Sequence, residues 1–322
     1  MDLDGANVLI TGGTGTFGRE ALKLLPQFRP RRLIVLSRDE YKQHYLQKEF
    51  PENDSSIYRY ILADVRDKDK LSVVTRNVDV IFHAAALKQV PFCETNPDEA
   101  IQTNVLGTKN VCEASMKNDV DSLIFVSSDK AVEPVNLYGA TKMVGERLVN
   151  QYNFKSDHTK FFTVRYGNVF NSRGSVVELF HQQKSEGVLT LTHPDMTRFF
   201  FLIQDAILFA AGVGGAGGEI FVPAMKSMRI CDLAKAIAPE AEIKIILRRH
   251  GEKVHEKLIS SDEADRTVFK NNKYIILPND RRFSFSRYNN SPKQEGLIYT
   301  SDRCCMDLDG VKEFLRNHDR NI

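Results

Sequence analysis

Six short runs rich in β-branched and aromatic residues recur through the first half of the chain, and segments with helical spacing of apolar residues separate them. The runs are NVLIT (7–11), RLIVLS (32–37), IYRYILA (57–63), VDVIFHA (78–84), SLIFVS (122–127) and FFTVRY (161–166). Strands that alternate with helices in this way form a parallel sheet covered on both faces. We therefore predict an α/β fold with a Rossmann-like, doubly wound parallel sheet.

The rest of the pattern predicts a long helix and a smaller lobe. Segment 97–117 opens with Pro97, a residue favoured at the first helical position, and keeps apolar residues at helical spacing. After about residue 167 the alternation becomes irregular, which predicts a smaller mixed α/β lobe. We assign residues 1–166 to the cofactor-binding core, to which later segments return, and residues 167–322 mainly to a substrate-binding lobe and a C-terminal extension. Within the second part we expect a Gly-rich stretch at 211–220, a short helix at 230–238, a strand at 243–247 and an exposed polar loop at 278–296.

Composition narrows the classes of partner. Of the 322 residues 42% are apolar and 27% charged, the net charge is +2, and both signs are interspersed. This balance gives no argument for nucleic acid or an anionic membrane as a partner. Neither a signal-peptide pattern nor an apolar window of membrane-spanning length is recognisable, so we expect a cytoplasmic protein. The five cysteines are odd in number and lack metal-ligand spacing, which predicts reduced thiols and no metal site.

The first predicted strand runs into TGGTGTFG (11–18), in which Gly12, Gly15 and Gly18 are spaced as G-x-x-G-x-x-G. Glycine lets the backbone approach a pyrophosphate closely, and the start of the helix that follows offers free N–H groups. Three glycines alone are a weak signal, but their place between a strand and a helix favours a dinucleotide site over an ordinary turn. Within this loop we expect cofactor contacts from Gly12, Thr14, Gly15, Thr16, Phe17 and Gly18.

The end of the second predicted strand bears on the choice between NADP and NAD. NAD sites place a carboxylate here for the ribose 2′-hydroxyl, whereas this chain offers Ser37 and Arg38 first, with Lys42 as a second cation. These groups suit a 2′-phosphate, so we predict NADP. Asp39 keeps NAD open as a minor alternative, because it could instead cap the next helix. Further cofactor contacts are expected from Asp64, which either reaches the adenine amino group or is a turn residue, and from Val65, Ala84 and Ala85.

Tyr138 and Lys142 lie four residues apart in a segment with helical periodicity, so both project from one face. A neighbouring ammonium favours the phenolate and lowers the pKa of a Tyr from about 10 toward neutrality. Tyr138 could then accept a proton from a substrate hydroxyl whose carbon gives a hydride to a nicotinamide. We expect both side chains to contact the cofactor as well, and Ser128 to hydrogen-bond the reacting hydroxyl.

Asp129 and Lys130 follow the fifth predicted strand, at the carboxyl edge of the sheet where ligands bind in open α/β folds. A solvated turn is the alternative interpretation, and spacing alone does not decide between the two. The chemistry of sugars does: oxidation at C4 makes the C5 proton acidic, so that a base at C5 and an acid at the C6 oxygen can eliminate water. Hydride returned to C6 then regenerates the cofactor. Lys130 can act as the base if burial beside the nicotinamide cation and Lys142 keeps it neutral part of the time.

Several segments together resemble a known family. They are TGGTGTFG (11–18), SRDEYKQ (37–43), HAAALKQVPFCETNPDEAIQTNVLGTKNV (83–111), SSDKAVEPVNLYGATK (127–142), VRYGNVFNSRGSVV (164–177), MTRFF (196–200) and RHGEKVHE (249–256). In this order they span about residues 5–260, and they resemble the inverting UDP-N-acetylglucosamine 4,6-dehydratases of the extended short-chain dehydrogenase/reductase superfamily.

The resemblance implies NADP-dependent loss of water from UDP-N-acetylglucosamine with inversion at C5. It implies that Asp129 is the acid at the C6 oxygen, that Lys130 is the base at C5, and that Tyr138 and Lys142 are the hydride-transfer pair. Non-inverting relatives have Met in place of this Tyr, so Tyr138, a possible proton donor to C5, favours the inverting branch. The resemblance places Lys88 near both the cofactor and the sugar. It also places near the UDP-sugar Asn168, Ser175, Val176, Arg198 and Arg249 (both for the pyrophosphate) and Glu252 (for the ribose).

The chain departs from the family at three places, and two other functions stay open. Ser128 replaces a Thr, His250 replaces a Pro, and 299–308 lacks the usual small polar residues after Asp302, which bears on the assembly and the substrate lobe. A UDP-sugar 4-epimerase is the first alternative, although it would give Asp129 and Lys130 no task. A catalytically silent NADP-binding sensor is the second. The resemblance also implies a homo-oligomer built from dimers, up to a hexamer, and a place in bacterial glycan biosynthesis such as a pseudaminic acid pathway.

Overall fold

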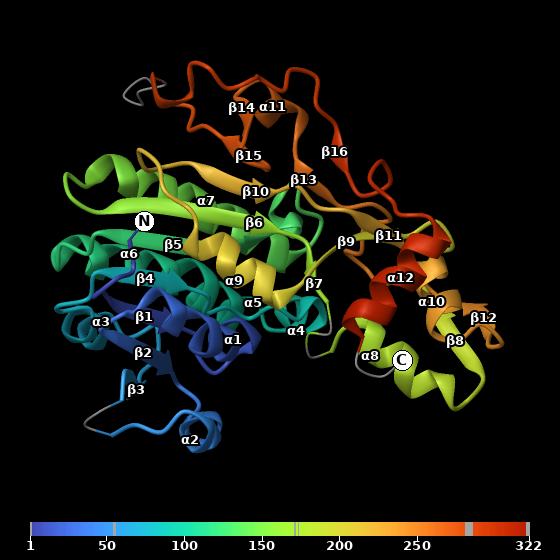
Figure 1. Ribbon diagram of the computed structural model, residues 1–322, viewed down its shortest axis with the longest axis horizontal. Coiled ribbons are helices and arrows are strands. Elements are labelled where there is room, and N and C mark those ends of the chain that lie inside the picture. Colours follow the sequence, from blue (N-terminus) through green and yellow to red (C-terminus); the bar gives the residue numbers. More distant parts are fainter. Residues whose placement is uncertain (1, 54–55, 171, 173, 281–285, 320–322) are drawn as a thin grey trace.

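The computed structural model describes residues 2–53, 56–170, 172, 174–280 and 286–319. Over these residues its main feature is a nine-stranded sheet in the order β14-β15-β10-β6-β5-β4-β1-β2-β3 (Figure 1). In the part of the sheet from β10 to β3, all neighbouring strands pair in parallel. At the other edge β15 and β14 are added as antiparallel strands. The strands are β1 (Asn7–Thr11), β2 (Arg32–Ser37), β3 (Tyr58–Leu62), β4 (Val80–His83), β5 (Ser122–Ser128), β6 (Lys160–Tyr166), β10 (Ile220–Pro223), β14 (Thr267–Lys270) and β15 (Lys273–Ile276).

The six predicted strands are confirmed, with small shifts at their ends. Strands β3 and β4 are shorter than predicted, whereas β5 and β6 each gain one residue. Their spatial order, β3-β2-β1-β4-β5-β6, is that of a doubly wound Rossmann sheet. In such a sheet the order in which successive strands are added reverses between β1 and β4, which opens a crevice at the carboxyl ends of these parallel strands. The predicted fold class is therefore correct.

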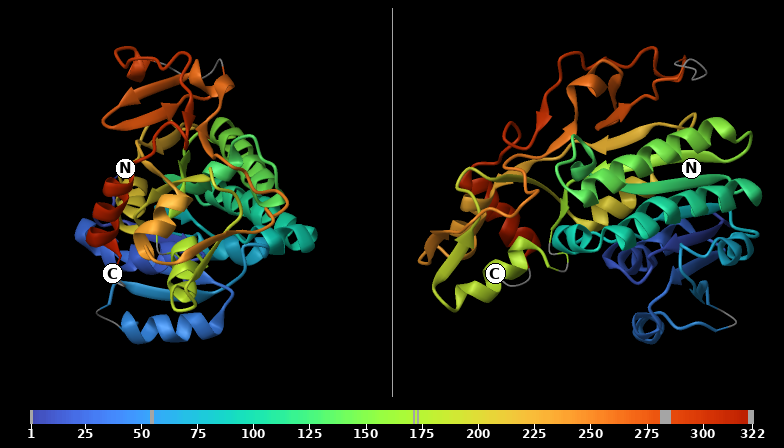
Figure 2. Two further views of the ribbon diagram at one scale, coloured as in Figure 1. Left: turned by 90° about the vertical axis from the view of Figure 1, so that its right-hand side faces the viewer. Right: turned by 180° about the vertical axis from the view of Figure 1, so that it is seen from behind.

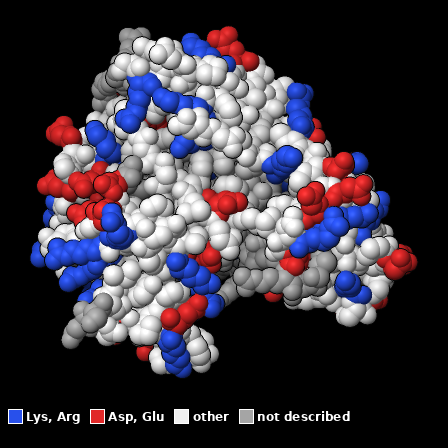
Figure 3. Space-filling model, viewed as in Figure 1, with Lys and Arg blue, Asp and Glu red and all other residues white. Residues whose placement is uncertain are grey.

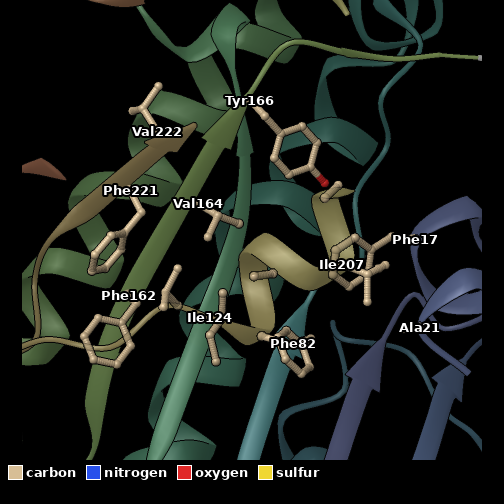
Figure 4. Close-up of a cluster of buried hydrophobic side chains, with 14 of the residues drawn as sticks. Phe17, Ala21, Phe82, Ile124, Phe162, Val164, Tyr166, Ile207, Phe221 and Val222 are labelled. Atoms are coloured by element: carbon tan, nitrogen blue, oxygen red, sulfur yellow. The ribbon is translucent and has the colours of Figure 1, made fainter. Parts of the chain in front are cut away.

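Alternate strand residues belong to two hydrophobic cores, one on each face of the sheet. On one face Phe82 and Ile124 pack with Phe17 of α1 and Ile207 of α9 (Figure 4). On the other face neighbouring residues such as Ile81 pack under α3, α6 and α7. This alternation with a period of two explains why both faces of the sheet are covered by helices. The helices are α1 (Thr16–Leu24), α3 (Lys68–Val74), α6 (Gly107–Lys117), α7 (Leu137–Lys155) and α9 (Ile203–Ala211).

The predicted helix over 97–117 forms, but its middle is irregular. Pro97 begins α5 (Pro97–Ala100), a π-helical stretch follows over Ile101–Leu106, and α6 completes the segment. In the π-helical stretch, the Asn104 side chain donates to the Leu87 carbonyl (2.9 Å) and accepts from the Leu87 N–H (2.8 Å). Such stretches are frequent at functional sites, and here this one fixes the segment that follows β4.

The smaller lobe lies beyond the carboxyl ends of the parallel strands (Figure 2). It has its own hydrophobic core, which includes Phe180 and Leu233. The predicted helix at 230–238 is confirmed, and the predicted strand at 243–247 forms but ends early, because its partner β8 ends at Leu191. The elements are β7 (Asn168–Val169), α8 (Val176–Lys184), β8 (Val188–Leu191), β9 (Thr197–Phe201), β11 (Ser227–Arg229), α10 (Ile230–Ile237), β12 (Glu242–Ile245) and α12 (Leu308–His318).

The polar segment 278–296, expected to be an exposed loop, contains two buried residues among those that the structure describes, Pro278 and Tyr288. Tyr288 is buried, and its hydroxyl donates to Glu219 (2.7 Å). Glu219 also accepts from the N–H of Gly217 (2.8 Å) in the Gly-rich stretch. One aromatic residue in a polar sequence thus anchors the segment to the sheet; residues 281–285 lie outside the described part. The remaining elements include α2 (Glu40–Glu49), α4 (Val90–Thr95), β13 (Lys257–Ile259), α11 (Ser261–Ala264) and β16 (Tyr299–Thr300).

The surface charges are mixed on the face that Figure 3 shows, where basic and acidic side chains alternate over both lobes. This arrangement agrees with the interspersed charges of the sequence. Among the helices that the structure describes, none combines the length and the apolar character needed to cross a membrane.

Candidate active site

A cleft of about 1070 Å³ opens at the carboxyl ends of the parallel strands and is also lined by residues of the smaller lobe. Of the residues predicted for the cofactor it is lined by Gly12, Thr14, Gly15, Thr16, Phe17, Ser37, Arg38, Lys42, Asp64, Val65, Ala84, Ala85 and Lys88. Of those predicted for catalysis and substrate it is lined by Ser128, Lys130, Tyr138, Lys142, Asn168, Ser175, Val176, Arg198, Arg249 and Glu252. Gly18 and Asp129 are the predicted residues that are not part of the lining.

The glycine loop allows close approach of the backbone. Gly12 has a φ of +67°, and a Cβ there would lie 2.8 Å from the Ala85 Cα, so only glycine fits. Gly15 caps α1 without a side-chain hydrogen bond, so no side chain covers the first N–H groups of the helix. A Cβ on Gly18 would lie 2.2 Å from the Gly13 carbonyl oxygen. Gly18 therefore lets α1 pack against the loop, and the expectation that it contacts the cofactor is not supported by its position.

Asp39 is the N-cap of α2, which is one of the two roles that the sequence left open for it. Its Oδ1 accepts from the Lys42 N–H (2.9 Å), and its Oδ2 accepts from the Lys42 ammonium. These hydrogen bonds hold the pKa of Asp39 below its ordinary value. Asp64 accepts from the Arg66 guanidinium (2.8 Å) and lies 3.4 Å from Arg38. Both carboxylates are thus paired with cations, and Arg38 remains exposed at the rim of the cleft.

Asp129 and Lys130 form a hydrogen-bonded ion pair rather than a solvated turn. Strand β5 ends at Ser128, whose side chain caps the 3₁₀ turn that follows. Lys130 Nζ donates to Asp129 Oδ1 (3.0 Å) and to Asn168 Oδ1 (2.9 Å). Asp129 is fully buried, and its Oδ1 also accepts from the Ser128 hydroxyl (2.8 Å). Its Oδ2 has no hydrogen-bond partner in the described part of the chain, which leaves one acceptor position for a ligand.

Lys130 is an ammonium in this arrangement, and not the partly neutral amine that the sequence led us to expect. Burial lowers the pKa of Lys130, but the charges of Asp129 and Glu256 raise it, and the result lies above the ordinary value of 10.5. Arg198 opposes these carboxylates only in part. A neutral Lys130 must therefore arise by transfer of its proton to a neighbouring group, for which Asp129 is the direct hydrogen-bond partner.

Tyr138 and Lys142 both line the cleft from α7, but they are not coupled as predicted. Burial raises the pKa of Tyr138 to about 12, while the charge of Lys130 and a hydrogen bond with Ser128 act in the opposite direction. Lys142 Nζ donates to the Val126 carbonyl (2.7 Å), and burial lowers the pKa of Lys142 to about 8. In the protein without ligands, the cation that favours a Tyr138 phenolate is Lys130 rather than Lys142.

The two arginines predicted for the pyrophosphate differ in their surroundings. Arg198, on β9, is buried and donates to the carbonyl oxygens of Lys253 (2.9 Å) and Val254 (3.1 Å). It also lies 3.6 Å from Glu252, whose second carboxylate oxygen has no partner among the described residues. Arg249 is exposed where it lines the cleft. Arg198 therefore holds the 252–254 loop in place, and Arg249 is the better placed for a phosphate.

The remaining substrate predictions lie at the edge of the cleft. Ser175 caps α8 by accepting from the Glu178 N–H (3.4 Å), so that Val176 begins a helix whose N-terminus lines the cleft. Lys88 is exposed in the segment held by Asn104. Residues 171 and 173 of the motif that precedes Ser175 lie outside the described part of the chain.

Two residues in the cleft region escaped the sequence analysis. Glu256 lines the cleft, is 3% exposed and lies 3.8 Å from Lys130 Nζ. Gly139 allows α7 to approach the Asp129–Lys130 turn, because a Cβ there would lie 2.2 Å from the Lys130 carbonyl oxygen. Glu256 ends the quoted RHGEKVHE segment, but nothing in a linear pattern brings residue 256 beside residue 130. Gly139 sits within LYGATK, where a helical glycine next to Tyr138 was the available signal.

Comparisons with known proteins place these observations in context. The model of the polysaccharide biosynthesis protein family matches residues 8–278. A UDP-N-acetylglucosamine 4,6-dehydratase (inverting) from Campylobacter jejuni is 43% identical over 311 residues, which cover 92% of each chain. A UDP-glucose 4-epimerase from Rickettsia bellii is 39% identical over 333 residues, covering 97% of this chain and 96% of the relative. The solved structure of Pen from Bacillus thuringiensis has a TM-score of 0.90 at 34% identity, covering 98% of this chain and 99% of that one.

Proposed function

Since the chain belongs to the polysaccharide biosynthesis protein family and to the group of inverting UDP-N-acetylglucosamine 4,6-dehydratases, we propose that it removes water from UDP-N-acetylglucosamine with inversion at C5. The product is UDP-2-acetamido-2,6-dideoxy-β-L-arabino-hex-4-ulose. The contact between Asp129 and Lys130 carries the proposal, because elimination of water needs an acid and a base beyond the tyrosine that serves hydride transfer.

The cleft fits a nicotinamide dinucleotide at the glycine loop. Gly12 leaves a cradle that a Cβ would fill, and the uncovered N-terminus of α1 suits a pyrophosphate. We assign NADP rather than NAD because Arg38 and Lys42 line the cleft after β2, while Asp39 is used as the cap of α2. A nicotinamide held there would supply the acceptor for the hydride of C4 and the donor of a hydride to C6.

Tyr138 begins the reaction by accepting the proton of the C4 hydroxyl. Because the pKa of Tyr138 is about 12, the phenol must first release its own proton to solvent, and nearby positive charge stabilises the phenolate that then accepts the proton of the C4 hydroxyl. Lys130 supplies such charge, and Ser128 supplies a hydrogen bond to the same group. The substrate leaves this step with a carbonyl at C4 and an acidic proton at C5.

Asp129 and Lys130 then eliminate water by sharing a single proton. Transfer of the Lys130 proton along the 3.0 Å hydrogen bond to Asp129 produces a neutral amine and a carboxylic acid without changing the charge of the site. The amine takes the C5 proton, and the acid gives its proton to the departing C6 hydroxyl as water. The pair ends as carboxylate and ammonium, which agrees with the 3.0 Å contact between the two side chains, and one internal transfer makes it ready again.

Tyr138 closes the cycle by donating its proton to C5 when C6 accepts the hydride. The proton that Tyr138 took from the C4 hydroxyl is thereby returned to the sugar, and the net loss is one water. Inversion requires this donor to act from the face opposite Lys130. We therefore assign Tyr138, which comes from α7, to one face of the sugar and Lys130, which comes from the turn after β5, to the other.

We propose that the nucleotide part of the substrate is bound mainly by residues of the smaller lobe that line the cleft. Arg249 pairs with the diphosphate through its fork of donors. Glu252 offers to the ribose hydroxyls a carboxylate oxygen that has no hydrogen-bond partner among the described residues. Arg198 contributes by holding the 252–254 loop, and the other residues that we assign to the UDP-sugar are Lys88, Asn168, Ser175 and Val176.

Incubation with UDP-N-acetylglucosamine in deuterated water, followed by mass spectrometry and NMR, tests the function. We expect a product that has lost one water, carries deuterium at C5 and has the inverted C5 configuration. A product that keeps the C6 hydroxyl would contradict the proposal. A protein that binds NADP and leaves every UDP-hexose unchanged would instead be the silent sensor.

A UDP-sugar 4-epimerase is the second candidate, because the Rickettsia relative of that name covers nearly the whole chain. Tyr138, Lys142 and the dinucleotide site would serve an epimerase equally well. The feature that favours the dehydratase is Asp129 Oδ2, which has no hydrogen-bond partner within the described ranges of the chain, next to a protonated Lys130. An epimerised product has the mass of the substrate, so the same incubation separates the two functions.

Three further properties stay predictions drawn from the family resemblance. They are a cytoplasmic location, a homo-oligomer built from dimers, up to a hexamer, and a product that enters bacterial glycan biosynthesis such as a pseudaminic acid pathway. Light scattering on the purified protein measures the mass in solution, and a monomer at micromolar concentration would contradict the second of these.

A further inference from the structure

Glu256 is a buried carboxylate that has no role in the reaction as described. Its Oε1 lies 3.8 Å from Lys130 Nζ, and its Oε2 lies 3.7 Å from Lys253 Nζ. The Oε2 atom has no hydrogen-bond partner in the part of the chain that the structure describes. A buried charge with an unsatisfied oxygen is costly, so its retention beside the catalytic lysine calls for an explanation.

The position of Glu256 is fixed by the C-terminal segment. Its N–H donates to the Ser301 hydroxyl (2.9 Å), and its carbonyl accepts from the Ser301 N–H (2.9 Å). Ser301 is fully buried, and its hydroxyl also lies 2.6 Å from the Thr197 hydroxyl. It directly follows β16, which pairs with β13, the strand that begins after Glu256. Segment 299–301 thus holds a carboxylate at the cleft.

The charges that face Lys130 come from several elements. Asp129 lies on the same turn, Glu256 precedes β13, and Arg198 extends from β9. Tyr138 faces it from α7. The two carboxylates outweigh burial and Arg198, so that the pKa of Lys130 lies above its ordinary value.

The charges that face Glu256 limit its effect. Besides Lys130 it faces Lys253, whose ammonium donates to the Val132 carbonyl (2.6 Å) and also interacts with Glu133. Burial lowers the pKa of Lys253 while Glu256 raises it. Glu256 therefore acts on two lysines, of which only Lys130 is hydrogen-bonded to the catalytic acid.

We propose that Glu256 is a positioning residue that acts through Lys130, keeping on the Asp129–Lys130 pair the one proton that elimination of water requires. This inference rests on the proposed function. The pair works only while it holds one proton, because Asp129 must have a proton to give to the C6 oxygen. Glu256 opposes loss of that proton to solvent at alkaline pH by stabilising the ammonium form.

Removal of the charge therefore has a specific consequence. In Glu256→Gln the pair loses its proton at a lower pH than in the wild type. Above that pH Tyr138 still supports oxidation at C4, but Asp129 has no proton for the leaving water. The reduced nicotinamide formed in the first step then accumulates, because no C6 acceptor is produced.

The test is a pH series with saturating UDP-N-acetylglucosamine, in which the dehydrated product and the absorbance of the reduced nicotinamide are followed together. In Glu256→Gln we expect the alkaline loss of product formation to move down by about one pH unit or more, with reduced nicotinamide building up there. Glu256→Asp, which keeps the charge, should restore most of the wild-type profile. Glu133→Gln is the matched control, because it removes an exposed carboxylate paired with Lys257 and should leave the profile unchanged.

A merely structural role predicts a different result, namely a fall in kcat by the same factor at every pH with the alkaline limb unmoved, and that outcome overturns the proposal. If Glu256→Gln does not fold, Ser301→Ala replaces it: loosening Glu256 should move the limb in the same direction by a smaller amount, and an unmoved limb counts against the proposal. A wild-type protein that forms no dehydrated product at any pH refutes the proposed function instead, so the two failures are distinguishable.

Discussion

Gly139 brings helix α7 into contact with the backbone of Lys130, since a Cβ on Gly139 would lie 2.2 Å from the Lys130 carbonyl oxygen. Tyr138 therefore sits beside the Asp129–Lys130 pair, although the tyrosine and the pair come from different elements. The close approach explains why the charges of Lys130 and Asp129 act on the pKa of Tyr138. It also makes a glycine hydrogen atom a structural requirement for the proposed reaction.

Substitution of this glycine should favour helix formation in α7 but lower the activity. In Gly139→Ala the intrinsic helix propensity improves by about 1 kcal/mol, but the methyl group must displace the Lys130 turn. We expect kcat to fall by about tenfold or more, since small displacements of reacting groups are costly. Ala140→Gly is the control, because it weakens the same helix without a clash. Activity of Gly139→Ala within about twofold of wild type would show that the close approach is dispensable.

Removal of the Lys130 amine should separate the oxidation at C4 from the loss of water. Lys130→Ala keeps Tyr138 and the glycine loop, so slow oxidation at C4 continues while loss of water stops. Stopped-flow absorbance should show reduced nicotinamide that forms and persists, and mass spectrometry should show no dehydrated product. Lys155→Ala, at the exposed end of α7, serves as control and should behave as wild type. Full dehydratase activity in Lys130→Ala would refute its assignment as the base.

The sheet was predictable from sequence because burial on both faces leaves a local signal. Ile81 and Phe82 are adjacent in the chain, pack into opposite cores and are both apolar, so the run they belong to reads as a buried strand. The glycine loop was predictable for a similar reason, since strand, turn and helix follow one another directly. In both cases the information lies within about twenty residues of chain.

The electrostatics of the site were not predictable, because they depend on contacts between distant segments. The sequence suggested that Lys142 acts on Tyr138, yet its amine is bound to the Val126 carbonyl and Lys130 takes that place. It suggested a neutral Lys130, yet Glu256 helps to keep this residue charged. Spacing along a helix gives the direction of a side chain but not what the rest of the fold brings to meet it.

Arg38 should decide the preference for NADP. It is exposed at the cleft and only 3.4 Å from Asp64 in a partly exposed pair, so it can turn to a 2′-phosphate at little cost. In Arg38→Ala we expect the Kd for NADP to rise by about tenfold and that for NAD to stay within about twofold, measured by calorimetry. Lys48→Ala, in the helix α2 that follows Arg38, is the control and should change the Kd for neither cofactor. Equal losses of affinity for NADP and NAD would mean that Arg38 contacts a part of the molecule that the two cofactors share.

Lys142 should make the stability of the cofactor-free protein depend on pH. Burial lowers its pKa from an ordinary 10.5 to about 8 in the folded protein. Between these values the unfolded chain holds a proton that the folded protein has released, so the free energy of unfolding rises with pH across this window. Below about pH 8 both states are protonated, and the penalty for burying the ammonium is present in full.

Lys142→Met removes this penalty and exposes its pH dependence. Near neutral pH the variant should be more stable than wild type by on the order of 3 kcal/mol, less whatever is lost with the hydrogen bond to Val126. Urea unfolding of the two proteins should show the difference shrinking as the pH rises from about 8 to 10.5. Lys155→Met, at an exposed position, should show no such trend. If the difference in the free energy of unfolding between Lys142→Met and wild type stays constant over this range, burial does not lower the pKa of Lys142.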